Sequence, residues 1–108
     1  MDKNKAIKIA ERYLAIVDKK YPIEQALLFG SFAKGTNHKD SDIDLAIFFS
    51  TTDDVIEMQA ELLKMRRDNE LLIEPHPFRI IDFKPSNPVA AGILKNEVEI
   101  KRHLAPER

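Results

Sequence analysis

The sequence contains no cysteine. Disulfide bonds and thiolate metal ligands are therefore excluded, and any metal ion must be bound through oxygen or imidazole. The absence of cysteine fits a reducing compartment. The sequence also lacks a leading apolar stretch like that of a signal peptide or a membrane-spanning helix, because charged and apolar residues alternate after Met1. We therefore expect a cytoplasmic protein with no membrane partner.

An excess of charge of one sign is also missing. The 17 lysines and arginines nearly balance the 18 aspartates and glutamates, so no overall positive field would attract long nucleic acid. Apolar residues make up 44% and charged residues 32% of the chain, which is typical of a globular protein. A chain of 108 residues can form one hydrophobic core, and we expect residues 1–108 to form a single domain.

Apolar spacing predicts the elements of the first half. From Asp2 to about Lys20, apolar residues recur every three or four positions, which indicates a helix that Pro22 ends. The remaining segments are a buried strand at Gln25 to Phe29, a helical turn at Ser31 to Lys34, a polar loop at Gly35 to Ser41 and a strand at Asp42 to Phe48. Because side chains alternate along a strand, Asp42 and Asp44 are expected on the same face.

A second long helix is expected after this strand. Thr51 or Thr52 is suited to the N-cap position, and Asp53 and Asp54 supply an acidic first turn. The apolar spacing continues to about Asn69.

The last segments predict the fold class. Leu71 to Glu74 begins a third strand, which Pro75 and Pro77 interrupt and Phe78 to Phe83 could resume at a sheet edge. A short helix at Pro88 to Lys95 and a strand at Val98 to Arg102 follow. The order of elements predicts an α+β fold, with a mixed β-sheet of about four strands and helices packed on one face.

Two neighbouring aspartates carry the first functional signal. Carboxylates on one face of a strand repel each other unless a cation lies between them, so Asp42 and Asp44 call for a cation. Hard oxygen ligands favour Mg²⁺, which binds one or two carboxylates and fills its shell with water and substrate phosphates. These residues therefore indicate a nucleoside triphosphate substrate.

The turn after the first strand carries the second signal. Gly30 lets the backbone approach a ligand closely, the Ser31 hydroxyl can donate a hydrogen bond to a phosphate, and Lys34 could add positive charge. Either signal alone is weak, since a Gly-Ser turn or an Asp-x-Asp pair often has only a structural role. Together, with a strand on both sides, Gly30-Ser31 and Asp42-x-Asp44 favour the functional interpretation.

These residues also carry a family resemblance. GSFAKG at 30–35 together with SDIDLAI at 41–47 resembles the signature of polymerase-beta-type nucleotidyltransferases, and the chain is most similar to the minimal nucleotidyltransferases from about Leu27 to Ile100. The resemblance implies that Asp42 and Asp44 bind Mg²⁺, with two ions in the complete site. It also implies that Gly30 and Ser31 hold the triphosphate of ATP, and that a third carboxylate lies on a neighbouring strand.

The third carboxylate has two candidates. Glu74 lies just inside a short strand after the long helix, as the superfamily pattern requires, and is the preferred residue. Asp82 lies in a second apolar run and is the alternative; otherwise it is an exposed charge at a strand end. His76, between two prolines, is interpreted as a polar surface group rather than a ligand.

The resemblance also implies an activity and a partner. A minimal nucleotidyltransferase transfers AMP from ATP to a hydroxyl acceptor, and the family analogy suggests a tyrosine of a HEPN-type toxin, which gives this chain an antitoxin role. The alternative is a non-catalytic module that binds a nucleotide or a partner. A metal-dependent nuclease is disfavoured, because Gly30-Ser31 would then have no role. Exposed strand edges could support a homodimer or a partner contact.

Overall fold

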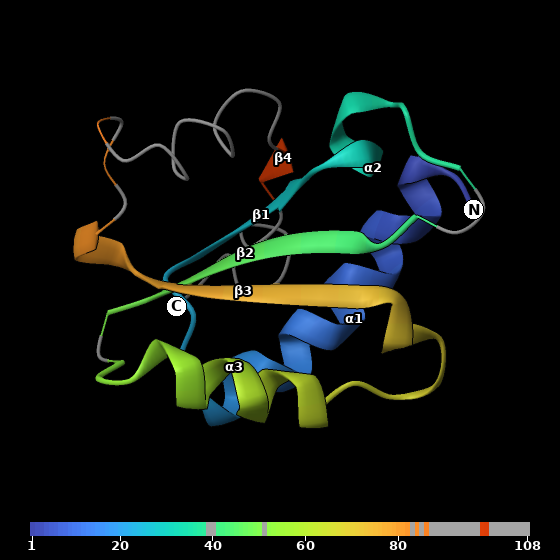
Figure 1. Ribbon diagram of the computed structural model, residues 1–108. Coiled ribbons are helices and arrows are strands. Elements are labelled where there is room, and N and C mark those ends of the chain that lie inside the picture. Colours follow the sequence, from blue (N-terminus) through green and yellow to red (C-terminus); the bar gives the residue numbers. More distant parts are fainter. Residues whose placement is uncertain (39–40, 51, 83, 85, 87–97, 100–108) are drawn as a thin grey trace.

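A computed structural model describes residues 1–38, 41–50, 52–82, 84 and 86, together with the backbone of 98–99. Four strands form one mixed sheet in the order β3-β2-β1-β4 (Figure 1). The strands are β1 Gln25–Phe29, β2 Ile43–Phe49, β3 Ile73–Arg79 and the two-residue β4 Val98–Glu99. The helices are α1 Lys3–Lys20, α2 Ser31–Lys34 and α3 Val55–Lys64, with 3₁₀ helices η1 Asp68–Leu72 and η2 Ile80–Asp82. The predicted α+β class is confirmed.

The pairing of the strands sets which residues face each other. β1 and β2 are antiparallel, with Phe29 opposite Asp44. β2 and β3 are parallel, with Asp44 opposite Glu74. A parallel pair requires a crossover, which α3 provides between the two strands. The end of β1 and the starts of β2 and β3 therefore meet at one end of the sheet, beside α2 (Figure 1).

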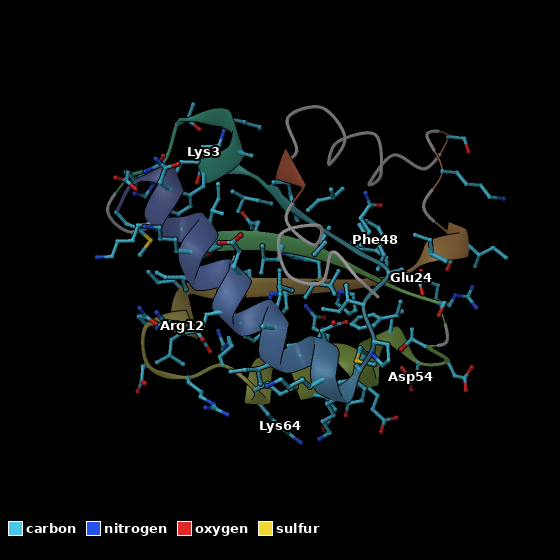
Figure 2. All side chains as sticks on the ribbon, turned by 180° about the vertical axis from the view of Figure 1, so that it is seen from behind. Lys3, Arg12, Glu24, Phe48, Asp54 and Lys64 are labelled. Carbon is cyan, nitrogen blue, oxygen red and sulfur yellow. The ribbon has the colours of Figure 1, made fainter. Side chains whose placement is uncertain are left out.

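Both long helices cover the same face of the sheet. Asp2 caps α1 by accepting a hydrogen bond from the Lys5 amide at 2.8 Å. The predicted stripe of α1 is buried: Ala6, Ile9, Ala10, Tyr13, Leu14 and Val17. It packs in one cluster with Leu62 of α3 and with the β2 residues Ile43, Leu45 and Ile47. Figure 2, seen from behind, shows α1 lying across this face.

The other face of β2 carries a smaller apolar cluster and the acidic residue. Leu27, Ala46 and Phe48 are buried there, and Phe48 stacks on Phe78 with ring centroids 5.4 Å apart. Asp44 lies on this face as well, because it alternates with Ile43 and Leu45. One face of the sheet thus packs into the main core. The other face carries the Asp44 carboxylate at one end, where a ligand could bind.

Both predicted boundaries of α3 were wrong. The N-cap of α3 is Asp54 and not a threonine, because its carboxylate accepts hydrogen bonds from the amides of Ile56 and Glu57. The helix ends at Lys64 rather than near Asn69, and Asp68–Leu72 forms a 3₁₀ helix. Arg66 stabilises this ending by donating hydrogen bonds to the carbonyls of Leu63, Leu71 and Ile73.

The third strand also differs from its prediction. β3 runs without interruption through Pro75 and Pro77 and ends at Arg79, where η2 replaces the predicted continuation. The strand lies at the edge of the sheet, where a proline removes no ladder hydrogen bond if its nitrogen faces away from the neighbour. The Pro75 carbonyl accepts a hydrogen bond from Gln59 of α3 at 3.1 Å. The helix predicted at Pro88 to Lys95 and the end of the last predicted strand lie outside the described residues.

None of the helices in the described part of the chain is long and apolar enough to cross a membrane.

One buried hydroxyl connects the two long helices. Tyr13 of α1 donates a 2.7 Å hydrogen bond to the Leu62 carbonyl in the last turn of α3. Burial raises the pKa of Tyr13 well above its ordinary value, while Arg66 lowers it and Glu70 raises it by smaller amounts. The hydroxyl is therefore neutral in the folded protein at pH values where an exposed tyrosine ionises.

We expect Tyr13→Phe to lower the free energy of unfolding by about 1 kcal/mol at neutral pH, because Leu62 loses its donor. Above about pH 10 the unfolded chain loses the tyrosine proton first, so the stability of the wild type falls as pH rises. Tyr13→Phe should flatten this fall. Urea unfolding at neutral and alkaline pH measures both effects.

The matched control is Tyr21→Phe, which removes a hydroxyl that donates a 3.3 Å hydrogen bond to Glu61 in a partly buried position. This variant should retain the alkaline loss of stability. If Tyr13→Phe and the wild type lose stability equally at alkaline pH, the Tyr13 hydroxyl is not the group that causes this loss.

Candidate active site

The two predicted halves of the site touch at Gly30 and Asp44. Gly30 follows β1 with φ 77° and ψ −153°, a conformation that is essentially restricted to glycine. A Cβ at this position would overlap Oδ2 of Asp44 and lie 3.1 Å from its Cγ. The Asp44 carboxylate therefore occupies the space that a side chain at position 30 would need, and the Gly-Ser turn and the Asp-x-Asp pair form one surface.

The other two predicted carboxylates lie near Asp44 in the chain or in the sheet. Asp42 is exposed and immediately precedes β2, rather than lying within the strand as predicted. Glu74 is half-buried and lies directly opposite Asp44 on β3. Neighbouring strands are about 4.8 Å apart, and directly opposed residues project from the same face of a sheet. The structure thus brings Glu74 to the same end and face of the sheet as Asp44.

Asp82, the alternative third carboxylate, lies at the other end of β3. It belongs to η2 and forms an ion pair with Arg79, at 2.7 Å from Nε and 3.2 Å from an Nη atom. Hydrogen bonding to Asp82 raises the pKa of Arg79. Arg79 pairs with Phe49 at the end of β2, five positions beyond Asp44. Asp82 is therefore separated from the other candidates by most of the strand.

His76 lies at the site and is not the surface group that its place between prolines indicated. Its Nε2 atom is 3.5 Å from Oδ1 of Asp44, and the two side chains are 37% and 27% exposed. The Nε2 atom itself is buried and has no hydrogen-bond partner among the residues that the structure describes. No short motif signals this position, because the contact depends on the parallel register that places His76 opposite Ala46.

The donors at this edge fit a divalent cation. Carboxylate oxygens and a buried imidazole nitrogen without a hydrogen-bond partner are suitable ligands. Among the described residues, no three histidine, aspartate or glutamate side chains lie close enough together to hold a metal ion by themselves. Mg²⁺ needs only one or two protein carboxylates, because water and substrate phosphates complete its shell. The arrangement therefore suits a metal ion that is bound together with a phosphorylated substrate.

The predicted phosphate-binding residues lie next to Asp44. Ser31 is half-buried at the start of α2, and Lys34 is exposed at its end. Phe32, between them, is buried in the main core and holds the short helix against the sheet. Among the described residues, neither the Ser31 nor the Lys34 side chain forms a hydrogen bond.

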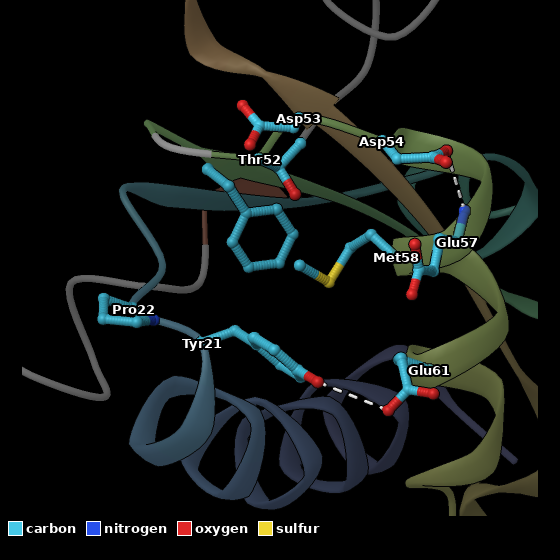
Figure 3. A pocket seen from close by; sticks show the side chains of 9 residues that line it. Tyr21, Pro22, Thr52, Asp53, Asp54, Glu57, Met58 and Glu61 are labelled. Atoms are coloured by element: carbon cyan, nitrogen blue, oxygen red, sulfur yellow. Dashed lines mark hydrogen bonds between the residues drawn. The ribbon is translucent and has the colours of Figure 1, made fainter.

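A separate cavity of about 310 Å³ lies at the opposite end of β2, between the end of α1 and the start of α3 (Figure 3). Tyr21, Phe49, Thr52 and Met58 line it together with Pro22 and the carboxylates of Asp53, Asp54, Glu57 and Glu61. None of the predicted site residues contributes to this cavity. The candidate site is instead the open surface around Asp44.

Comparisons with known proteins identify the family and the fold. Residues 11–103 match the model of the family described as polymerase beta, nucleotidyltransferase. No curated protein matches the sequence. A protein of Sulfolobus solfataricus, proposed to be a nucleotidyltransferase, superposes with a TM-score of 0.67 at 20% identity, over 90% of this chain and 80% of that chain.

Two further similar structures come from toxin–antitoxin complexes. A chain from a complex with AMP-PNP has a TM-score of 0.56 at 19% identity, over 83% of this chain and 71% of that one. A chain from the MntA–HpeT pair, in a mutant with two aspartates replaced by glutamates, has a TM-score of 0.51 at 19% identity, over 93% and 73%. At these identities the structures show a shared fold.

The contact between Gly30 and Asp44 predicts a specific sensitivity. Gly30→Ala should lower the free energy of unfolding by about 2–3 kcal/mol, through backbone strain and displacement of the carboxylate. It should also weaken Mn²⁺ binding, measured by calorimetry on the folded fraction.

Gly35→Ala is the matched control, because Gly35 also has a positive φ, 78°, but no described atom beyond its chain neighbours lies within 4 Å of its Cβ position. This variant should cost only about 1 kcal/mol and leave metal affinity unchanged. Equal loss of metal affinity in the two variants would show that the Gly30 contact does not position Asp44.

Proposed function

Because this chain belongs to the polymerase beta nucleotidyltransferase family, we propose that it transfers a nucleoside monophosphate, AMP from ATP, to a hydroxyl acceptor. The observation that carries the proposal is the close approach of Asp44 to Gly30, which joins the metal-binding and phosphate-binding halves of the signature. Asp42, Asp44 and Glu74 would hold two Mg²⁺ ions, and Gly30, Ser31 and Lys34 would hold the triphosphate. Bound Mg²⁺ would supply charge neutralisation at the phosphates.

In the proposed reaction, the acceptor oxygen forms a bond to the α-phosphorus of ATP. The bond from that phosphorus to the bridging oxygen of the β-phosphate breaks, and pyrophosphate leaves with the electron pair. The proton of the acceptor hydroxyl passes to a carboxylate, for which Glu74 is the candidate. The Ser31 hydroxyl would donate a hydrogen bond to a phosphate oxygen, and Lys34 would offset the negative charge that moves onto pyrophosphate.

The choice of Glu74 over Asp82 follows from position. Glu74 is opposite Asp44 in the sheet, whereas Asp82 is held by Arg79 at the far end of β3. A carboxylate that accepts a proton at the reacting phosphate must be within hydrogen-bond reach of the acceptor in the substrate complex. Asp82 would have to leave its bidentate ion pair and cross the length of the strand to do so.

We propose a tyrosine of a HEPN-type toxin as the acceptor, which would make this protein a cytoplasmic antitoxin. Support comes from two structures of the same fold, both from toxin–antitoxin complexes and one of them with AMP-PNP. The mutated aspartates in the second complex are separated by one residue, as Asp42 and Asp44 are. The alternative is a module that blocks its partner through contact alone, with a nucleotide that only stabilises the complex.

Asp44→Asn tests the catalytic role. With the co-expressed HEPN-type partner and ATP labelled at the α-phosphate, this variant should transfer label at least about 100-fold more slowly, because a metal-binding carboxylate carries several kcal/mol of charge stabilisation. Labelling at the wild-type rate would mean that Asp44 is not catalytic. Calorimetric binding of Mg-ATP without pyrophosphate release in the wild-type complex would favour the non-catalytic module.

A pair of variants tests the third carboxylate. Glu74→Gln should slow transfer by about 100-fold or more, since a positioned general base contributes on that scale. Asp82→Asn removes an exposed ion pair, which contributes little to stability, and should leave the transfer rate within about twofold of the wild type. The reverse result would assign the role to Asp82. Thermal unfolding of each variant separates loss of activity from loss of fold.

A further inference from the structure

We propose that Nε2 of His76 is a direct ligand of the divalent cation at Asp44, so that this metal site contains one nitrogen donor among its oxygen donors. The inference rests on one part of the proposed function, the binding of a divalent cation by Asp44. It does not depend on the nucleotide, the acceptor or the transfer reaction. It adds a residue to the site that the Asp-x-Asp signature does not contain.

The first observation is the position of the side chain. His76 of β3 lies opposite Ala46 of β2 and two positions after Glu74. It therefore projects from the same face as Glu74 and Asp44. Its Nε2 atom is 3.5 Å from Oδ1 of Asp44. Two ligands at right angles around Mg²⁺ are about 3 Å apart, so the observed separation needs only a small adjustment for both atoms to bind one ion.

The second observation concerns the hydrogen bonding of Nε2. The atom is buried and forms no hydrogen bond within the described part of the chain, although Oδ1 of Asp44 is 3.5 Å away. A buried polar atom without a hydrogen bond is destabilising, and native proteins contain few of them. A cation between Nε2 and Oδ1 would satisfy both atoms. The two atoms do not form a direct hydrogen bond, and their 3.5 Å separation is longer than the usual length of about 2.7–3.2 Å of such a bond.

The third observation is that the ring is held in place. The Phe29 ring packs against the imidazole with centroids 5.2 Å apart and an interplanar angle of 59°. Phe29 is also the residue opposite Asp44 and immediately precedes Gly30. Pro75 and Pro77 restrict the backbone on both sides of His76. Packing and backbone thus fix the imidazole before any ion binds, which lowers the entropic cost of ligation.

A nitrogen ligand has a consequence for metal selectivity. Mg²⁺ prefers oxygen ligands, whereas imidazole suits Zn²⁺ and other transition-metal ions, and Mn²⁺ binds more tightly than Mg²⁺ where nitrogen is present. His76 should therefore raise the preference of the site for Mn²⁺ over Mg²⁺. Removal of the imidazole should reduce Mn²⁺ affinity by about tenfold or more, on the scale reported for groups that tune metal sites, and should reduce Mg²⁺ affinity less.

Pulsed electron paramagnetic resonance of the full chain, loaded with Mn²⁺ and inorganic triphosphate, tests this directly, because this probe supplies phosphate oxygens to the ion and contains no nitrogen. A directly bound imidazole nitrogen produces a ¹⁴N modulation in the Mn²⁺ signal. The wild type should show it and His76→Gln should lose it, with the expected fall in Mn²⁺ affinity measured by calorimetry. The matched control is His38→Gln, which removes an exposed imidazole and should keep the modulation. The proposal is overturned if the wild type shows no ¹⁴N modulation, or if the modulation persists in His76→Gln.

A second variant keeps the test decisive if His76→Gln does not fold. The chain has three histidines, so His38→Gln combined with His103→Gln leaves His76 as the only one. Growth of this double variant with ¹⁵N-labelled histidine should convert the ¹⁴N modulation to that of ¹⁵N. Failure of the modulation to respond to the label would assign it to another nitrogen and overturn the proposal.

The outcomes for His76 and for the proposed function are separate. A modulation from His76 in a protein that transfers no AMP to its partner would support the ligand and contradict the transferase assignment. AMP transfer by a protein whose Mn²⁺ signal contains no histidine nitrogen would support the transferase assignment and contradict His76 as a ligand.

Discussion

The carboxylate of Asp44 lies in the space where the side chain of any other residue at position 30 would begin. This contact exists because β1 and β2 are antiparallel and because Phe29, the last residue of β1, is opposite Asp44. A shift of one residue in this register would turn Asp44 toward the main core and Leu45 toward solvent. The burial of Ile43, Leu45 and Ile47 against the long helices therefore also fixes the acidic residue on the opposite face.

The two faces of the sheet have different roles: one carries the main hydrophobic core and the other carries the candidate site. Its helix-covered face contains most of the buried apolar side chains and the hydrogen bond from Tyr13 to Leu62. Its other face carries Asp44, Glu74 and His76 at one end, and a small apolar cluster around Phe48 further along. Charged groups at the end of the open face can remain accessible to a triphosphate without disturbing the core. The acidic cavity between α1 and α3 lies at the other end of β2, apart from these groups.

The edge strand β3 contributes more to the candidate site than a third carboxylate. Its two prolines are compatible with an edge position, where no further strand needs their missing amide hydrogens. They also flank the histidine whose Nε2 atom faces Asp44. The candidate site, for which the signature residues supply only oxygen ligands, thus has an imidazole nitrogen 3.5 Å from Asp44. If this nitrogen binds the ion, as proposed, it changes which metal ions the site prefers.

Local sequence determined much of the fold. The three-and-four spacing of apolar residues predicted α1, because burial of one helical stripe needs no knowledge of its partner. Gln25–Phe29 and Ser31–Lys34 were also predicted with the bounds that the structure has. The end of α3 and the path of β3 were not predicted. Arg66 closes α3 through carbonyls that come later in the chain, and prolines are tolerated in β3 only because it lies at an edge.

Some residues of the candidate site could likewise be predicted from the sequence, whereas others depended on the tertiary structure. Gly30-Ser31 and Asp42-x-Asp44 could be recognised from the sequence, because both halves have a local backbone pattern that suits phosphate and metal ligands. Whether Glu74 or Asp82 lies beside Asp44, and what His76 contacts, depended on the parallel register of β2 and β3. That register is decided by how the crossover helix and the two strands bury their apolar faces together, and no single segment of the sequence encodes it.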